Sequence, residues 1–95
     1  MDNLLNYKLV GFRKSQRKNK KYDAILEHKQ NGKNKFVAFG QLPYQHYQDR
    51  TGLDIYKHLN HYDKNRRRLY RTRAGANNYQ NVIFSPAYFS WNYLW

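Results

Sequence analysis

The chain has 95 residues, and its 18 Lys and Arg against 6 Asp and Glu give a formal net charge of +12. It has no Cys, which excludes disulfides and thiolate metal sites. No apolar run approaches the ~18 residues of a transmembrane helix, and the first residues lack the features of a signal peptide. We therefore expect one small basic domain over residues 1–95.

The first predicted strand covers residues 4–12, where apolar residues alternate but both faces of the strand are partly apolar. Residues 13–21 (RKSQRKNKK) follow, with six cations and no apolar side chain. This composition predicts an exposed basic loop or a protruding hairpin tip.

A β-hairpin is predicted next, from alternating residues 22–29 and the β-rich residues 34–39. Asn31-Gly32 lies between them and favours a type I′ turn, in which both central residues need positive φ. Gly40 is expected to end the third strand, which leaves a three-stranded antiparallel meander.

The second half predicts loops and short helices. Residues 41–51 are polar and predict a loop, whereas the apolar spacing over residues 53–59 suits one or two helical turns. Asp63 is a good N-cap for a helix over residues 64–74, with Gly75 as its left-handed stop.

Ser85-Pro86 predicts the start of an aromatic C-terminal helix over residues 85–95, with Ser as N-cap and Pro at the first helical position. The fold class is therefore α+β: a small three-stranded antiparallel sheet, with the Asn31-Gly32 hairpin, packed by two or three short helices.

Six of the ten residues from Lys64 to Arg73 (KNRRRLYRTR) are cationic. Wound as a helix, they place four cations within an arc of about 100°: Lys64, Arg67, Arg68 and Arg71. Leu69 and Tyr70 fall on the opposite side and are expected to face the sheet, while Arg66 and Arg73 lie between and can extend their stems along the core.

Two dense basic runs on so basic a chain indicate a polyanionic partner. Arg guanidinium groups match phosphate oxygens in bidentate geometry, and no motif for sequence-specific reading is present. The candidate polyanion-binding residues are Arg13, Lys14, Arg17, Lys18, Lys20, Lys21, Lys64, Arg67, Arg68 and Arg71.

Catalytic and metal sites have weaker support in the sequence. Residues 59–63 (LNHYD) are faintly similar to part of a His-Asn-His nuclease, but no His follows His61 to complete that chemistry. His46, His58 and His61 would lack the usual carboxylate or thiolate co-ligands for a metal. We predict no catalytic residues, no metal and no cofactor, and interpret His61 as a turn residue and Asp49 and Asp54 as turn or cap residues.

The aromatic C-terminus has two interpretations. It can close the core against the sheet, or it can dock on a partner through Tyr88, Trp91 and Trp95, because Trp and Tyr dominate interface hot spots.

Residues 22–95 resemble a family of short, basic, uncharacterised proteins of large double-stranded-DNA (giant) viruses. The motifs that carry the resemblance are Phe39-Gly40, Tyr44/Tyr47/Asp49, Tyr56/Leu59/His61/Asp63, Arg66 to Arg73, and Ser85-Pro86 to Trp95. One departure is Ala74-Gly75, where the family often has a His after the Arg-rich helix. The family has no established activity to transfer; the resemblance implies a viral source and a virion component.

The leading hypothesis is a non-enzymatic virion protein that binds a polyanion, foremost viral double-stranded DNA without sequence specificity. The alternative is a minor capsid or cement protein that docks on acidic capsid surfaces, with a His-Asn-His-like nuclease as a distant third. The expected locations are the virion and, during infection, the host cytoplasm or nucleus.

Overall fold

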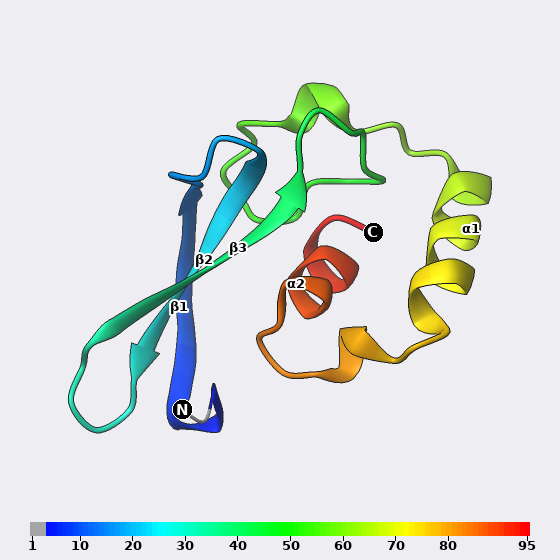
Figure 1. Ribbon diagram of the computed structural model, residues 1–95. Coiled ribbons are helices and arrows are strands. Elements are labelled where there is room, and N and C mark those ends of the chain that lie inside the picture. The colour runs from blue at the N-terminus through cyan, green and yellow to red at the C-terminus, as the bar shows by residue number, and fades with distance from the viewer. Residues whose placement is uncertain (1–3) are drawn as a thin grey trace.

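The computed structural model describes residues 4–95, as a three-stranded antiparallel sheet and two α-helices (Figure 1). The strand order is β1-β2-β3, so the predicted α+β meander is confirmed. The elements are η1 (Leu4–Asn6), β1 (Tyr7–Lys14), β2 (Lys20–His28), β3 (Asn34–Gln41), η2 (Lys57–Leu59), α1 (Lys64–Gly75), η3 (Tyr79–Asn81) and α2 (Pro86–Tyr93), where η marks a 3₁₀ turn.

A β-bulge explains why both faces of the first strand look apolar. Leu9 pairs with Leu26 but Gly11 pairs with Ile25, so Val10 is an extra residue in β1. Tyr7 and Leu9 face the core before the bulge and Phe12 faces it afterwards, while Val10 is exposed. The bulge moves the inward positions by one residue, which a strict period of two cannot predict.

The basic run over residues 13–21 is not a single exposed loop but the tip of the β1–β2 hairpin, the second of the two predicted forms. Its first two cations belong to β1 and its last two to β2, so only residues 15–19 form the turn. Arg13 pairs with Asp23 across the ladder and donates from Nε to the carboxylate at 3.0 Å. The strand ladder therefore extends into both ends of the run, and one of its cations has a cross-strand acid.

The hairpin at Asn31-Gly32 is confirmed, but the two-residue type I′ turn is wrong. Residues 29–33 form a longer loop, closed by a hydrogen bond of 2.8 Å from the His28 N–H to the Lys33 carbonyl. Gly32 has a φ of +72°, whereas Asn31 does not adopt positive φ. The Asn31 side chain instead accepts from the Lys33 N–H at 2.9 Å, which replaces the turn by an Asx motif.

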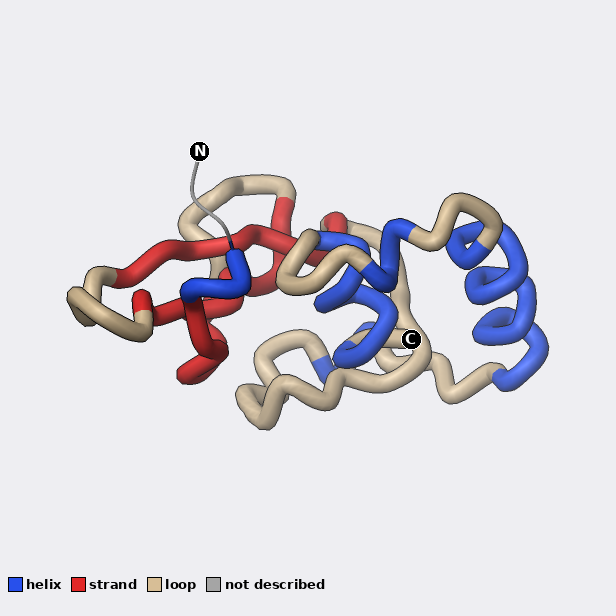
Figure 2. The backbone as a smooth tube through the Cα atoms, turned by 90° about the horizontal axis from the view of Figure 1, so that it is seen from below, coloured by secondary structure: helices blue, strands red, loops and turns tan. Residues whose placement is uncertain are grey.

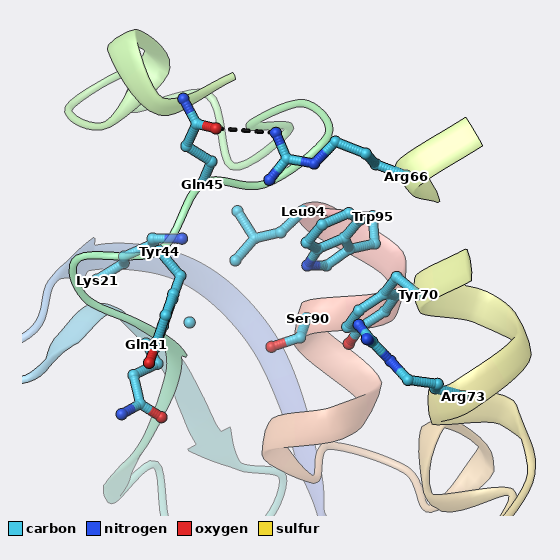
Figure 3. Close-up of a pocket in the computed structure, with 11 residues that line it drawn as sticks. Lys21, Gln41, Tyr44, Gln45, Arg66, Tyr70, Arg73, Ser90, Leu94 and Trp95 are labelled. Carbon is cyan, nitrogen blue, oxygen red and sulfur yellow. Dashed lines mark hydrogen bonds between the residues drawn. The ribbon is translucent and has the colours of Figure 1, made fainter. Parts of the chain in front are cut away.

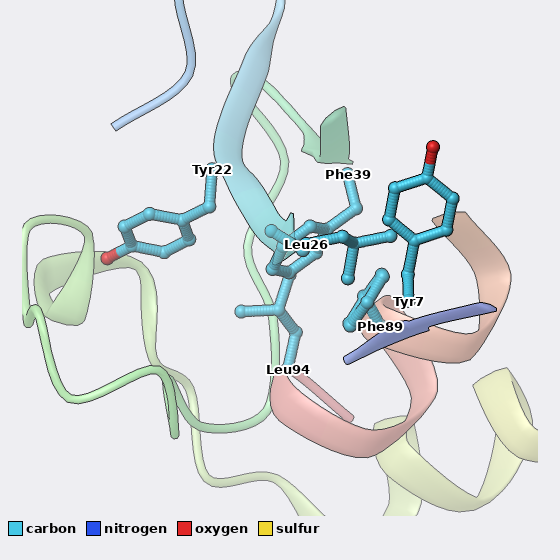
Figure 4. Packing of buried hydrophobic residues seen from close by; sticks show 7 residues of the cluster. Tyr7, Tyr22, Leu26, Phe39, Phe89 and Leu94 are labelled. Carbon is cyan, nitrogen blue, oxygen red and sulfur yellow. The ribbon is translucent and has the colours of Figure 1, made fainter. Parts of the chain in front are cut away.

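The core lies between the sheet and α2 (Figure 4). Tyr22, Leu26 and Phe39 from the sheet are fully buried together with Phe89 of α2. Phe39 and Phe89 have ring centroids 5.4 Å apart, within the range of favourable aromatic pairs. As predicted, Ser85 caps α2 by accepting from the Tyr88 N–H at 3.1 Å, with Pro86 in the first turn.

Gly40 does not end β3, which continues to Gln41. Its φ is +76°, and a Cβ at this position would lie only 2.9 Å from Leu94 Cδ1. Glycine therefore lets the strand approach Leu94, which is buried immediately after α2.

Residues 42–63 form a long connection with little regular structure. Its predicted helical turns reduce to the single 3₁₀ turn η2, preceded by Asp54 at a φ of +56°. His46 and Asn60 form an isolated β-bridge that holds the two ends of this connection together.

The basic helix is confirmed as α1, and Asp63 caps it through hydrogen bonds from Asn65 N–H at 2.9 Å and Arg66 N–H at 3.1 Å. Gly75, however, is helical rather than left-handed, and the left-handed residue is Asn78, with a φ of +57°. α1 nevertheless ends at Gly75; Ala76 caps it in a right-handed helical conformation, and a turn over residues 76–78 leads to η3, whose N-cap is Asn78.

α1 does not pack on the sheet, contrary to the prediction. Figures 1 and 2 show α2 between the strands and α1, and α1 at the far end of the molecule. Tyr70 stacks on Trp95 instead, and Leu69 remains exposed. The C-terminal aromatics therefore take the place of the sheet as the surface against which α1 packs. None of the described helices is long and apolar enough to cross a membrane.

Candidate functional site

The four cations predicted to share one face of α1 do lie together. They line a shallow hollow of about 450 Å³, hereafter the outer groove, formed by Lys64, Arg67, Arg68, Arg71 and Thr72. No acidic side chain is among these lining residues. The groove therefore concentrates positive charge along one face of α1.

Two cations of the outer groove also have a structural role that the sequence did not reveal. Arg67 Nε and Arg71 Nη2 donate to the main-chain oxygen of Trp95 at 3.1 and 2.9 Å, and Arg50 Nη2 donates to the same oxygen at 2.7 Å. Three guanidinium groups thus converge on one acceptor. Burial, then the charges of Arg67 and Arg50, lower the pKa of Arg71, so this cluster favours added negative charge.

The aromatic C-terminal residues contact this chain's own side chains, as the core-closing interpretation expects. Trp95 stacks on Tyr70 with ring centroids 4.3 Å apart, and the Arg71 guanidinium lies 4.4 Å from the Trp91 ring centroid. Tyr88 contacts Phe89 edge-on. Docking of Tyr88, Trp91 and Trp95 on a partner stays a prediction.

The six cations of residues 13–21 differ in accessibility. Arg13 is tied to Asp23 and lies over the Phe36 ring, and Lys21 is only 2 % exposed. Lys20 is half-buried, which leaves Lys14, Arg17 and Lys18 exposed at the turn. The structure therefore removes Lys21 from the accessible surface and ties the partly exposed Arg13 to an acidic side chain.

Lys21, near the start of the central strand β2, belongs to a buried polar network. Its Nζ donates to His46 Nδ1 at 3.0 Å, and His46 Nε2 in turn donates to Asn60 Oδ1 at 2.6 Å. Burial lowers the pKa of Lys21 to about 8. Burial and the Lys21 charge lower the pKa of His46 to about 4, so its ring is neutral at pH 7.

Asp49 completes this network as a turn residue, in agreement with its predicted role. Its carboxylate accepts from the Thr51 N–H at 2.9 Å, from the Thr51 hydroxyl at 2.7 Å, and from the Tyr22 hydroxyl. Burial, followed by this hydrogen bond, raises the pKa of Tyr22 to about 12. The hydrogen-bond donors to the carboxylate are neutral, and its charge also interacts with the Lys21 ammonium group, so the network holds residues 46–60 against β2.

His61 is also a turn residue, as predicted. Its Nδ1 accepts from the Asp63 N–H at 2.9 Å, one residue before α1. Among residues 4–95 no group of three or more His, Cys, Asp or Glu side chains lies close enough to hold a metal ion.

A second hollow, which the sequence did not indicate, lies on the other side of α1 (Figure 3). It measures about 380 Å³ and is named here the Trp95 pocket. It brings Arg66 and Arg73 of α1 opposite the segment that follows β3, with Ser90 and Leu94 between them. Of its lining residues, the sequence marked Lys21 as a polyanion-binding candidate, Trp95 as a docking candidate, and Arg66 and Arg73 as cations on the flank of the helix.

Residues 10–50 match the model of a family of unknown function (DUF5754). The match covers most of the sheet and the start of the long connection, and it stops before α1. No curated protein and no solved structure matches this chain. The viral source and the virion location expected from the resemblance stay predictions.

Proposed function

We propose that the protein binds double-stranded DNA without sequence specificity, through the outer groove of α1. The observation that carries this proposal is the lining of the groove, with four cations and no acid. Phosphate-rich polymers suit such a surface because each phosphate neutralised by Lys or Arg releases condensed counterions.

The charge balance of the rest of the chain supports a partner of opposite charge. Within residues 4–95 one ion pair forms, between Arg13 and Asp23. Asp49 is occupied by neutral donors and Asp63 caps α1. Among residues 4–95, no cation of α1 therefore forms an ion pair with an Asp or Glu side chain.

The shape of α1 also suits a nucleic-acid backbone. The helix stands at one end of the molecule, away from the sheet (Figure 2). Lys64 and Arg71 are seven residues apart, which at ~1.5 Å per residue is about 10 Å along the helix axis. Measured along the duplex axis, that length corresponds to about three phosphates of one DNA strand, which rise ~3.4 Å each. With the viral source that the resemblance implies, DNA binding through α1 would give the protein a non-enzymatic role on packaged viral DNA.

The test is a titration with a fluorescent non-specific DNA duplex at several salt concentrations. A Lys64→Gln/Arg68→Gln double variant removes the two exposed cations that do not bind Trp95. We expect its slope of log K against log salt to become shallower by up to about 2, because each phosphate contact contributes about −0.9.

The matched control is Lys29→Gln/Lys33→Gln, which removes the same charge from the β2–β3 loop at the opposite end of the molecule (Figure 1). We expect this control to keep most of the slope. Equal losses in the two double variants, or no binding of wild type at low salt, would contradict the proposal.

A capsid or cement role is a second candidate, and a different observation favours it. Three large apolar side chains that follow α1 in the chain are exposed to solvent: Tyr79, Val82 and Ile83. Exposed apolar side chains suit a protein interface better than a DNA-binding surface. A wild type that fails to bind duplex at low salt but binds an acidic protein surface would support this candidate instead.

A further inference from the structure

The Trp95 pocket has the size and lining of a small-molecule site. Its volume of about 380 Å³ lies within the roughly 300–1,000 Å³ of ligand pockets. A neighbouring, smaller hollow of about 270 Å³ shares Arg66, Arg73 and Trp95 with the Trp95 pocket. The same three residues therefore border an extended recess between α1 and the end of the chain.

The electrostatics of the pocket select an anion. Lys21, Arg66 and Arg73 are among its lining residues and no acidic residue is. Burial lowers the pKa of Lys21 to about 8, so its ammonium group is still mostly protonated at pH 7. An anionic group in the pocket would therefore be attracted by Lys21 of β2 and by Arg66 and Arg73 of α1.

Several polar groups in the pocket have no partner within the described chain. No hydrogen bond of residues 4–95 involves the Arg73 guanidinium, the Ser90 hydroxyl or the Gln41 side-chain amide, whereas Arg66 donates to Gln45 Oε1 at 2.9 Å. Figure 3 shows Arg73 and Ser90 on one side of the hollow and Gln41 on the other. Donors and acceptors that converge on a hollow are typical of a recognition site.

An aromatic side chain stands opposite these cations. Tyr44 is 66 % exposed and forms the wall that faces Trp95 and Tyr70 (Figure 3). Trp95 and Tyr70 already cover one face of each other, but no ring or cation of residues 4–95 covers the Tyr44 ring. Tyr44 is therefore free to stack on a flat, apolar group such as a nucleobase.

We propose that the Trp95 pocket binds a nucleoside 5′-phosphate unit, with the phosphate at Arg66 and Arg73 and the base stacked on Tyr44. Arg guanidinium groups bind phosphate through paired hydrogen bonds, and the Gln41 amide can meet a base edge. The unit could come from a free nucleotide or from an unpaired nucleotide of a strand. Arg66 and Arg73 do not line the outer groove, so this site does not depend on the function proposed above.

The test is a titration of the full chain with adenosine 5′-monophosphate, followed by tryptophan fluorescence and calorimetry. We expect saturable binding, and at least about tenfold weaker binding of adenosine, because it lacks the charged group. Arg73→Gln and Tyr44→Ala should each weaken the nucleotide by about the same factor. Both side chains are exposed and unbonded in the described chain, so the thermal midpoint should not move.

Arg68→Gln is the matched control, because it removes the same charge from the same helix outside the pocket. A single-stranded oligonucleotide that competes with the nucleotide would assign the unit to a strand, and failure to compete would assign it to a free nucleotide. The proposal is overturned if wild type binds neither probe, or if Arg68→Gln weakens the nucleotide as much as Arg73→Gln does. Loss of duplex binding in the Lys64→Gln/Arg68→Gln variant tests only the DNA-binding function of the outer groove and has no bearing on the nucleotide site, because neither residue lines the Trp95 pocket.

Discussion

Tyr70 of α1 stacks on Trp95 with ring centroids 4.3 Å apart and ring planes 8° apart. The stack joins the basic helix to the end of the chain. Two arginines of the same helix, Arg67 and Arg71, strengthen this contact because they donate hydrogen bonds to the Trp95 main-chain oxygen. The helix that carries the proposed DNA surface is therefore held by aromatic and guanidinium contacts and not by the sheet.

Tyr70→Ala should loosen α1. A favourable aromatic pair contributes about 0.5–1.5 kcal/mol beyond the area it buries, so we expect a loss of about 2 kcal/mol in the free energy of unfolding. Amide exchange in α1 should accelerate more than exchange in β2. Tyr70→Phe keeps the ring and serves as control, and a uniform acceleration across the chain in Tyr70→Ala would show that α1 has no separate stability.

Gly40→Ala should destabilise the fold more than Gly52→Ala. Both glycines have positive φ, +76° and +86°, but a Cβ on Gly40 would meet Leu94 at 2.9 Å, whereas a Cβ on Gly52 would meet nothing within 4 Å. Left-handed backbone costs about 1–2 kcal/mol at each position. The clash adds about 1–3 kcal/mol at Gly40 alone. Urea unfolding of both variants measures the difference, and equal losses would show that Leu94 moves aside without cost.

Acid should destabilise the protein through His46. Its folded pKa is lowered to about 4 from an ordinary 6.5, so between these values the unfolded state binds a proton that the folded state excludes. The stability contribution is present above pH 6.5 and is lost as the pH falls to 4.

Thermal midpoints between pH 7 and pH 4 test this expectation. His46→Gln should flatten the profile, and His58→Gln, at an exposed position, should leave it unchanged. Burial also lowers the pKa of His61, so part of the slope should remain. A profile of His46→Gln that parallels wild type would contradict the prediction.

Asp63→Ala should cost about 1 kcal/mol of stability, the usual loss on removal of an N-cap side chain. The Asp63 carboxylate accepts from two N–H groups of the first turn of α1. Asp63→Asn keeps an acceptor at the same position and should recover most of the loss. Denaturant unfolding distinguishes the two variants, and an equal loss in both would assign the effect to charge instead of capping.

The turn over residues 15–19 should contribute to DNA affinity as a separate contact. Arg17 and Lys18 are exposed there, and Figure 1 places the turn and α1 on opposite sides of the molecule. Arg17→Gln/Lys18→Gln should therefore weaken duplex binding less than Lys64→Gln/Arg68→Gln, and the two losses should add. Duplex titrations of both double variants and of the combined variant show whether the two losses in binding free energy add. If the turn variant alone abolished duplex binding, the DNA interface would lie at the turn and not at α1.

Local patterns alone predict much of this fold. The hairpin at Asn31-Gly32, the caps at Asp63 and Ser85, and the grouping of four cations on α1 depend on neighbours in the chain. The type I′ turn and the left-handed conformation of Gly75 were wrong, because an Asx contact forms at Asn31 and the backbone stays right-handed through Ala76. The basic run adopts the hairpin-tip form, with Arg13 paired to Asp23, and not the exposed loop.

By itself, the sequence determined that the chain is a small basic α+β domain, because composition, turn chemistry and periodicity act over a few residues. Only the tertiary structure decided which cations are free. It buried Lys21 beside His46 and turned Arg67 and Arg71 toward Trp95. It also placed Arg66 and Arg73 around a pocket. These roles depend on contacts between residues about 20 or more positions apart, and no local pattern encodes such contacts.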